Sequence, residues 1–433
     1  MDYKKIYQEK LCSAEEIAKR VQSGWVLGLD SGPVATPAII DAIIKRAKTG
    51  EIDKIKVHNM LDYYPFDFYY ENLLGKIESV SWFSGPGSRN AVNSGFGDFG
   101  PAYFHEIPTL YRKFYDFDVF ITQVSPMDKH GYMSLGICAA SSAGLLDKSK
   151  RIFVEVNENM PRACGGINIH VKDIDGIVEN HIPVPTLEPS VIDDTSRKIG
   201  ELIAEQIPDG ACIQLGIGAI PDATGMALKN KKDLGIHTEM FAGSMVDLIE
   251  CGAVNNSKKQ IHRYKSVTTF AYGPRRMYDY IDDNPSVLFL PVEYVNDPNV
   301  ISQNDNVISI NACMEVDLWG QVCSESIGTR HFSGTGGQVD YVRGATRSKG
   351  GKSFIAFQST AKNGTISKIV PCLAEGAICT TNKNEVDYIV TEYGIAHLRG
   401  QPISSRARQL IQIAHPDFRD ELTFAARKRG MLI

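Results

Sequence analysis

The chain has 433 residues, which is too long for one hydrophobic core and favours two or three domains. With 43% hydrophobic and 22% charged residues, its composition is typical of a folded globular protein and excludes a largely disordered chain. The net charge of −5, without any block rich in lysine and arginine, argues against a nucleic-acid partner.

The N-terminal segment and the cysteine pattern predict a cytoplasmic protein with reduced thiols. The first twenty residues are charged and amphipathic and contain no apolar core of signal-peptide length. No run approaches the ~18 apolar residues of a membrane span, so we expect no membrane partner. Nine scattered cysteines without a Cys-x-x-Cys pair, and ten histidines without metal-ligand spacing, predict neither a disulfide framework nor a metal. Cys212, Cys313 and Cys379 lie in apolar runs and are expected to be buried.

Apolar runs along the chain predict strands that alternate with helices. In chain order the runs are KIKVHNML (54–61), DVFITQVS (118–125), RIFVEVN (151–157), CIQLGI (212–217), IHTEM (236–240), VTTFAYG (267–273), SVLFLPVEYV (286–295), VISINA (307–312), SFIAFQST (353–360), AICTTN (377–382) and VDYIVTEYG (386–394). One helix is expected over 226–235, where an amphipathic segment closes on Gly235. The alternation predicts an α/β fold with mostly parallel sheets and ligands beyond the carboxyl ends of the strands.

One proline-rich segment predicts a domain boundary. HIPVPTLEPS (181–190) holds three prolines, which favour an extended chain and exclude a helix. We therefore expect an N-terminal α/β domain at 1–180, a linker at 181–190 and a C-terminal α/β domain at 191–433, with a site between the domains.

The two halves repeat each other weakly. Each half has a helix, a glycine, a short apolar strand and, eight residues after the first glycine, another glycine that opens a second helix. The matching positions are Gly24 with Gly210, Gly32 with Gly218, and residues 118–136 with 306–325. A period this long predicts two duplicated, open domains of similar topology.

Three familiar motifs are absent or lack their context. GFGDFG (95–100) matches a dinucleotide fingerprint, but no strand precedes it and Pro101 follows. GGKS (350–353) resembles the end of a P-loop, but Thr346 stands where the first glycine is needed. No Gly-x-Ser-x-Gly nucleophile elbow occurs, which disfavours a serine hydrolase of that type.

Two glycine-rich clusters keep a functional interpretation. QLGIGAIP (214–221) follows a strand and opens a helix, so its backbone N–H groups and the helix N-terminus favour a negatively charged group. GTGGQVDYVRG (334–344) is a second glycine-rich loop. The alternatives are an ordinary turn between strand and helix for the first cluster and a flexible surface tip for the second.

Glu239 is an acidic residue in an apolar setting. It precedes Met240, Phe241 and Ala242. A carboxylate among such apolar neighbours loses hydration, and this cost is offset only where a nearby group interacts with the carboxylate. The alternative is a strand end whose glutamate points at solvent.

The combination of QLGIGAIP, IHTEMFAGS, GTGGQVDYVRGA and VTEYGIAHLRG (390–400) resembles the acetyl-CoA hydrolase/transferase family. More narrowly, it is similar to the 4-hydroxybutyrate CoA-transferases, which are glutamate-dependent class I CoA-transferases. The resemblance begins at GLDSGPVATP and covers essentially the whole chain. It implies the CoA-transferase (NagB/RpiA-like) fold of two open α/β domains, coenzyme A as co-substrate without a metal, short-chain carboxylates as partners, and a homodimer or a dimer of dimers.

The resemblance also implies roles for individual residues. Glu239 is the nucleophile, which attacks an acyl-CoA thioester and then carries CoA as a glutamyl thioester before a second carboxylate accepts it. Gln214 and the backbone from Gly216 to Ile220 stabilise the tetrahedral oxyanion, with Gly218 counted among the catalytic positions. The CoA contacts expected from these two loops fall on Gly216, Ile217, Gly218, Ala219, Ile220, Gly334, Gly336 and Gly337.

Further residues are candidates for contacts with CoA and the substrates. Lys362 is a candidate for the CoA phosphates, with a solvent-facing lysine as the alternative. Asn311 is expected to bind the acyl or glutamyl carbonyl, and Glu392 to support the site from behind. Ser31 and His130 are candidates for the carboxylate pocket, with plain loop positions as the alternative.

Three other functions stay open. An acetyl-CoA hydrolase would use water in place of the second carboxylate, and a butyryl-CoA:acetate CoA-transferase would differ only in its substrates. From another class, a non-catalytic CoA- or nucleotide-binding module would leave Glu239 merely solvated. The acyl chain is not readable from the sequence, because one methylene changes binding by only ~1–3 kcal/mol.

Overall fold

The computed structural model describes residues 2–432, and the chain forms two units by its internal contacts. The first unit comprises Met1–Leu187 and Val267–Val295, and the second comprises Glu188–Ser266 and Asn296–Ile433. The linear division into 1–180 and 191–433 stays a prediction. The compact units differ from it in one segment, residues 267–295, which packs with the first unit.

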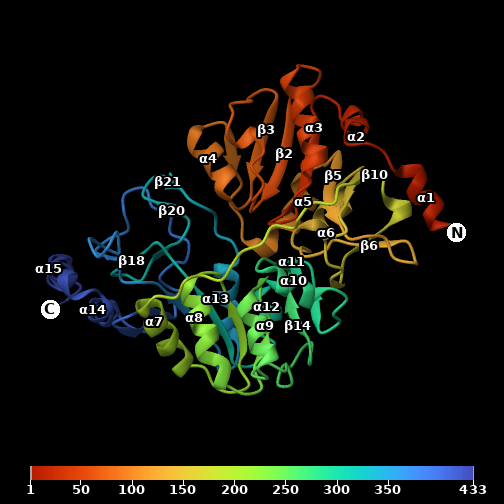
Figure 1. Ribbon diagram of the computed structural model, residues 1–433. Coiled ribbons are helices and arrows are strands. Elements are labelled where there is room, and N and C mark those ends of the chain that lie inside the picture. The colour runs from red at the N-terminus through yellow and green to blue at the C-terminus, as the bar shows by residue number, and fades with distance from the viewer. Residues whose placement is uncertain (1, 433) are drawn as a thin grey trace. The chain divides into compact units, whose positions relative to one another are not determined.

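The first unit is built on a seven-stranded sheet in which every neighbouring pair is parallel (Figure 1). In spatial order its strands are β10 (Gly176–Glu179), β7 (Ile152–Val156), β5 (Val119–Val124), β1 (Val26–Ser31), β2 (Ile55–Met60), β3 (Ile77–Ser81) and β4 (Gly97–Phe99). Its helices include α1 (Tyr3–Lys10), α2 (Ala14–Arg20), α3 (Pro37–Lys48), α4 (Pro86–Ser94), α5 (Ile107–Phe114), α6 (Ser142–Lys148), α10 (Arg275–Ile281) and α11 (Val292–Val295). Small sheets join β14 (Ser266–Thr268), β16 (Val287–Phe289) and β8 (Cys164–Gly165), and β6 (Tyr132–Ser134) with β9 (Asn168–His170).

The second unit is built on a six-stranded sheet, parallel except for its last pair. Its strands are β12 (Gly235–Ile236), β11 (Cys212–Leu215), β17 (Val307–Asn311), β22 (Lys352–Ala356), β26 (Tyr388–Thr391) and β27 (Gly394–His397). Its helices include α7 (Asp194–Glu205), α8 (Ala219–Ala227), α9 (Gly243–Glu250), α12 (Pro298–Ile301), α13 (Gln338–Arg347), α14 (Ile403–Ile413) and α15 (Arg419–Lys428). Short strands beyond the sheet include β13 (Met240–Phe241), β18 (Glu315–Asp317), β19 (Val322–Cys323), β20 (Ser326–Ile327), β21 (Arg330–His331), β23 (Thr360–Ala361), β24 (Ile366–Ser367) and β25 (Ile369–Val370).

The predicted duplication is confirmed by the topology. In both units the first strand of the sheet lies between the second strand and a later parallel strand: β1 lies between β2 and β5, and β11 lies between β12 and β17. The paired glycines also match, because Gly24 and Gly210 precede these first strands with φ of 80° and 77°. Positive φ is a conformation that glycine adopts at little cost, which explains why the repeat keeps glycine there. The predicted α/β class with mostly parallel sheets is therefore confirmed.

Two clusters of buried hydrophobic side chains stabilise the second unit. One packs β22, β26 and β27 against α14 and α15 through buried side chains such as Ile355, Ile389 and Leu410. The other joins Cys212 of β11 and Val307 of β17 to Tyr341 and Ala345 of α13. Because these side chains are removed from water, the position of α13 relative to the sheet is fixed by burial. α7 and α8 lie side by side (Figure 1).

Several local expectations were wrong. The helix predicted over 226–235 ends earlier, because α8 stops at Ala227 and Gly235 instead begins β12, where pairing with β11 overrides the local helical pattern. The segment 286–295 is a strand only up to Phe289, and after Pro291 it becomes α11.

Three further differences concern loops. Residues 377–382 form no strand, since Ile378 donates its N–H to the Ser326 hydroxyl and pairing is limited to one bridge from Thr381 to Val322. The glycine-rich segment 334–344 is a loop only as far as Gly337, after which α13 begins. Cys212 and Cys313 are buried as expected, whereas Cys379 is exposed on the irregular segment.

Within residues 2–432, no helix is both long and apolar enough to cross a membrane.

Candidate active site

Glu239 lies just beyond the carboxyl end of β12, the edge at which ligands bind in parallel α/β sheets. His237 and Thr238 link it to the strand and are fully buried, and the Thr238 hydroxyl donates a 3.0 Å hydrogen bond to the Met240 carbonyl. This bond fixes the turn that carries Glu239. The apolar neighbours noted in the sequence, Met240 and Phe241, are buried in β13.

The carboxylate of Glu239 is held by two features that are distant in sequence. Asn296 Nδ2 donates a 2.7 Å hydrogen bond to Glu239 Oε2. The same oxygen lies against Gly337, where a Cβ atom would be only 1.6 Å from it. Gly337 is the residue that precedes α13, so the carboxylate sits at a helix N-terminus, where partial positive charge favours an anion.

Asp340 opposes that stabilisation. It is fully buried in the first turn of α13, and its Oδ2 lies 3.5 Å from the same Asn296 amide nitrogen. Burial raises the pKa of Glu239 to about 7, the Asn296 hydrogen bond lowers it, and the negative charge of Asp340 raises it further. A carboxylate poised near neutrality and partly stripped of water is a better nucleophile than a solvated one.

The sequence missed Asn296 and Asp340. Asn296 follows the run 286–295, which reads as one strand, although Pro291 within it is a signal against a continuous strand. Asp340 lies in a segment interpreted as loop, and only the helix that begins at Gln338 turns it towards Glu239.

Gln214 and Asn311 meet at the carboxyl ends of β11 and β17. Gln214 Oε1 accepts a 3.1 Å hydrogen bond from the Ile310 N–H, and its Nε2 lies 3.5 Å from Asn311 Oδ1. Because 3.5 Å is long for such a bond, Nε2 is only weakly engaged. The structure thus brings these two predicted residues together, and their catalytic roles stay a prediction.

The first glycine-rich loop lines a cavity of about 680 Å³ in the second unit. Its wall includes Ile217–Pro221, Ala312–Glu315, Ala356–Gln358, Thr360–Lys362 and Ile366–Lys368. These segments follow β11, β17 and β22, or belong to the hairpin that comes next. Gly218 has φ of 119° with open space where a Cβ would lie, so its backbone is accessible from the cavity.

Lys362 and Lys368 supply positive charge to this cavity. Lys362 is exposed at the tip of the hairpin formed by β23 and β24. Lys368, which the sequence did not indicate, donates a 2.8 Å hydrogen bond to the Cys313 carbonyl, and its Nζ lies 5.0 Å from the ring centre of Phe357. Two ammonium groups beside an apolar wall suit a ligand with both phosphate and hydrocarbon parts.

The second glycine-rich loop is organised differently. Gly334 and Gly336 have φ of 152° and 56°, and Thr335 between them is 3.4 Å from Glu325 Oε1. Gln338, next to Gly337, donates a 3.2 Å hydrogen bond to the carbonyl of Ala312, which lines the cavity. The loop therefore connects Glu239 to the cavity, and the CoA contacts predicted for its glycines stay a prediction.

Glu392 acts on the cavity wall through Ser359. Its carboxylate accepts hydrogen bonds from the Ser359 N–H at 2.9 Å and from the Ser359 hydroxyl at 2.5 Å. Ser359 is buried between Gln358 and Thr360, which both line the cavity. Glu392 thus holds a residue behind the cavity wall, and its supporting role in catalysis stays a prediction.

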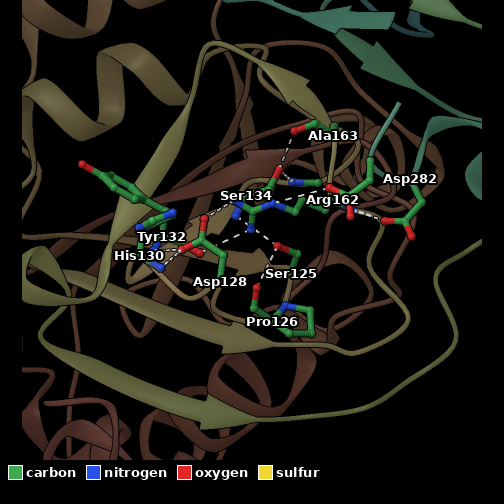
Figure 2. A network of polar contacts seen from close by, with 11 residues as sticks. Ser125, Pro126, Asp128, His130, Tyr132, Ser134, Arg162, Ala163 and Asp282 are labelled. Carbon is green, nitrogen blue, oxygen red and sulfur yellow. Dashed lines mark hydrogen bonds and ion pairs between the residues drawn. The ribbon is translucent and has the colours of Figure 1, made fainter. Parts of the chain in front are cut away.

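Ser31 and His130 belong to the first unit. Ser31 ends β1, is buried, and its hydroxyl lies 3.3 Å from that of Ser141. His130 is exposed on a loop that Asp128 organises by accepting hydrogen bonds from the His130 and Tyr132 N–H groups (Figure 2). Arg162 pairs with the other oxygen of Asp128 at 2.7 Å. These hydrogen bonds explain the conformation of the loop without a substrate. A role of Ser31 or His130 in binding the substrate stays a prediction.

The part of the chain that the structure describes contains no cluster of three or more His, Cys, Asp or Glu placed to hold a metal ion.

Known proteins resemble this chain over nearly its whole length. The families described as acetyl-CoA hydrolase/transferase N-terminal domain and C-terminal domain match residues 1–188 and 273–426. A succinyl-CoA:cyclohexane-1-carboxylate CoA transferase of Geobacter metallireducens is 48% identical over 99% of this chain and 98% of its own length. A 4-hydroxybutyrate coenzyme A transferase of Clostridium kluyveri is 45% identical over 99% of this chain and all of its own. The crystal structure of RipA from Yersinia pestis matches with a TM-score of 0.94 and 39% identity over both full chains.

Proposed function

We propose that this chain, which belongs to the acetyl-CoA hydrolase/transferase family, moves CoA between a short-chain acyl-CoA and a free carboxylate with Glu239 as the nucleophile. The observation that carries the proposal is the setting of that carboxylate. Glu239 is fixed by Asn296 and Gly337, has a pKa raised to about 7, and is linked through Gln338 to a cavity with two lysines.

The proposed reaction has two matching halves. Ionised Glu239 attacks the thioester carbonyl, the C–S bond breaks, and CoA leaves as a thiolate beside a mixed anhydride. The thiolate attacks the glutamyl carbonyl and releases the first carboxylate, which leaves CoA bound to Glu239 as a thioester. A second carboxylate then reverses the two steps and departs as a new acyl-CoA. Each step exchanges one acyl bond for another, so the energy of the thioester is conserved on the enzyme.

Each step passes through a tetrahedral oxyanion, which needs hydrogen-bond donors. The weakly engaged Nε2 of Gln214 and the backbone N–H groups from Gly216 to Ile220 are the donors we assign to it. One such donor is worth ~3–4 kcal/mol in other enzymes. In the same proposal, Lys362 and Lys368 receive the CoA phosphates, and the apolar wall receives the rest of the thiol arm.

The names of the two relatives suggest succinate, cyclohexane-1-carboxylate and 4-hydroxybutyrate as acids to test, and butyrate and propionate extend the series of short-chain acids. Acetyl-CoA should be incubated with butyrate, 4-hydroxybutyrate, propionate, succinate and cyclohexane-1-carboxylate while the new acyl-CoA is followed. Transfer to at least one acid, lost in Glu239→Ala, is the expected result. Absence of both transfer to every acid and release of CoA to water, with CoA binding intact, would leave a binding module as the better description.

An acetyl-CoA hydrolase stays the second candidate, because it would share the nucleophile and the oxyanion donors. Release of CoA that ignores added acid would favour it over transfer. The homodimer and the cytoplasmic location remain predictions.

A further inference from the structure

The strand that leads to Glu239 lies at the edge of its sheet. β12 ends the order β12-β11-β17-β22-β26-β27, so it has a strand neighbour on one side only. On that inner side the Gly235 N–H donates to the Ala211 carbonyl at 2.8 Å, and the His237 N–H donates to the Ile213 carbonyl at 3.3 Å. On the outer side, the N–H and carbonyl groups of Ile236 need hydrogen-bond partners other than a neighbouring strand.

On the outer side of β12, two side chains supply the hydrogen bonds that a neighbouring strand would otherwise make. Asn256 Oδ1 accepts a 2.8 Å hydrogen bond from the Ile236 N–H, and Lys259 Nζ donates a 2.7 Å hydrogen bond to the Ile236 carbonyl. Ile236 is fully buried, and Asn256 and Lys259 are 6% and 4% exposed. Without these partners both backbone groups would be buried unpaired, which is unfavourable.

Both side chains are themselves anchored. Lys259 Nζ also donates to the Lys265 carbonyl at 2.6 Å, and Asn256 Nδ2 donates to the Ser266 hydroxyl at 3.1 Å. The lysine stem packs on Gly235, where a Cβ would lie 2.6 Å from Lys259 Cγ. Ile236 is therefore held in place by its pairing with β11 on one side and by hydrogen bonds to two anchored side chains on the other.

A lysine at this position has a cost in stability as well as a gain. Its two hydrogen-bond acceptors are backbone carbonyls, and burial lowers the pKa of Lys259 to about 8, so the buried charge is costly. An apolar side chain of similar length would fill the same space without that cost. What it would not supply is a donor aimed at the Ile236 carbonyl.

We propose that Asn256 and Lys259 are positioning residues for the nucleophile. By fixing the Ile236 peptide they set the position of Glu239, three residues further on, relative to Asn296 and Gly337. The inference rests on the proposed role of Glu239. Misplacing a reacting group by about 1 Å can cost on the order of 100-fold in rate, so a loosened β12 affects chemistry before it affects binding.

The test is Lys259→Met, measured as the single-turnover rate at which acyl-CoA loads CoA onto the enzyme, together with the Kd for free CoA. We expect the loading rate to fall by about tenfold or more, with the Kd within about twofold of wild type, because neither Asn256 nor Lys259 lines the cavity. A purely structural role would lower the melting temperature and leave the loading rate of the folded protein unchanged.

Lys352→Met is the matched control. Lys352 lies in the same unit at the start of β22, the opposite end of the strand from the site, and donates a 3.0 Å hydrogen bond to the Gln206 carbonyl. It should lose stability without slowing the loading step. Equal slowing in the control would overturn the inference by assigning the effect to general loosening of the unit.

Asn256→Gly provides the second variant if Lys259→Met does not fold. Asn256 has φ of 57°, so glycine removes the acceptor without adding backbone strain. A folded variant of either kind that loads CoA within about twofold of wild type refutes the positioning role. If Glu239→Ala itself still transfers, the proposed function fails instead, which separates the two outcomes.

Discussion

The side-chain amide of Asn296 bonds Glu239 at 2.7 Å and lies 3.5 Å from Asp340, so one nitrogen faces two carboxylates. Asn296 favours the ionised form of Glu239, and Asp340 disfavours it. Burial and these two opposing effects together raise the pKa of Glu239 to about 7.

Asn296→Ala should move the acidic limb of the pH–activity profile to higher pH. Removing the donor raises the pKa of Glu239 further above about 7, so less of the nucleophile is ionised at neutral pH. A hydrogen bond to a charged group is worth about 1.5–3 kcal/mol, which corresponds to a loss of roughly 10- to 100-fold in kcat/KM. The profile of kcat/KM for acyl-CoA measures this directly, and an unmoved limb would contradict the role of Asn296.

Asp340→Asn should shift the same limb in the opposite direction. Removing the negative charge lowers the pKa of Glu239, so ionisation, and with it kcat/KM, begins at lower pH. The two variants serve as controls for each other, because general damage to the site would not shift the limb both ways. A shift to higher pH in Asp340→Asn would mean that Asp340 supports the site in some other way.

Gly337→Ala should abolish transfer in a folded protein. The new Cβ would stand 1.6 Å from Glu239 Oε2 and 2.4 Å from Asn296 Nδ2, so the carboxylate must leave its position. Gly166→Ala is the matched control, since its Cβ would meet its nearest neighbour at an ordinary 3.5 Å. Circular dichroism checks folding, and normal transfer by folded Gly337→Ala would show that the carboxylate works from another position.

Glu392→Gln should raise the KM for acyl-CoA several-fold with a smaller effect on kcat. Glutamine keeps one acceptor oxygen but cannot accept both hydrogen bonds from Ser359, so the cavity wall from Gln358 to Thr360 loosens. Glu421→Gln, on an exposed position of α15, should leave both constants unchanged. A fall confined to kcat would indicate that Glu392 acts on the chemistry rather than on binding.

Local sequence patterns were sufficient for the framework of this site. The alternation of strands with helices predicted mostly parallel sheets, and the repeat predicted a glycine at position 218 before a helix, where α8 begins. Glu239 stood out because a carboxylate beside Met240 and Phe241 loses hydration. The fold prediction was confirmed because strand and helix patterns depend on residues close together in the sequence, whereas the role of Glu239 stays a prediction.

The supports of Glu239 could not be predicted in the same way. Asn296 lies 57 residues from Glu239 and bonds its Oε2, and Lys259 lies 23 residues from Ile236 and bonds its carbonyl. No local periodicity marks such contacts, since they exist only after α13 and β12 have packed on the sheet. The misassigned helix at 226–235 has the same origin, because pairing with β11 decides where β12 begins.

The most direct measurement of the central claim is the mass of the peptide from Ile236 to Met245 after incubation with acyl-CoA and no acceptor acid. The account predicts CoA bound covalently to Glu239, and borohydride, which reduces a thioester but not a free carboxylate, should inactivate the enzyme only after acyl-CoA is supplied. Glu239→Ala should show neither the label nor transfer while still binding CoA. Label on another residue, or transfer at a comparable rate by the alanine variant, would contradict the account.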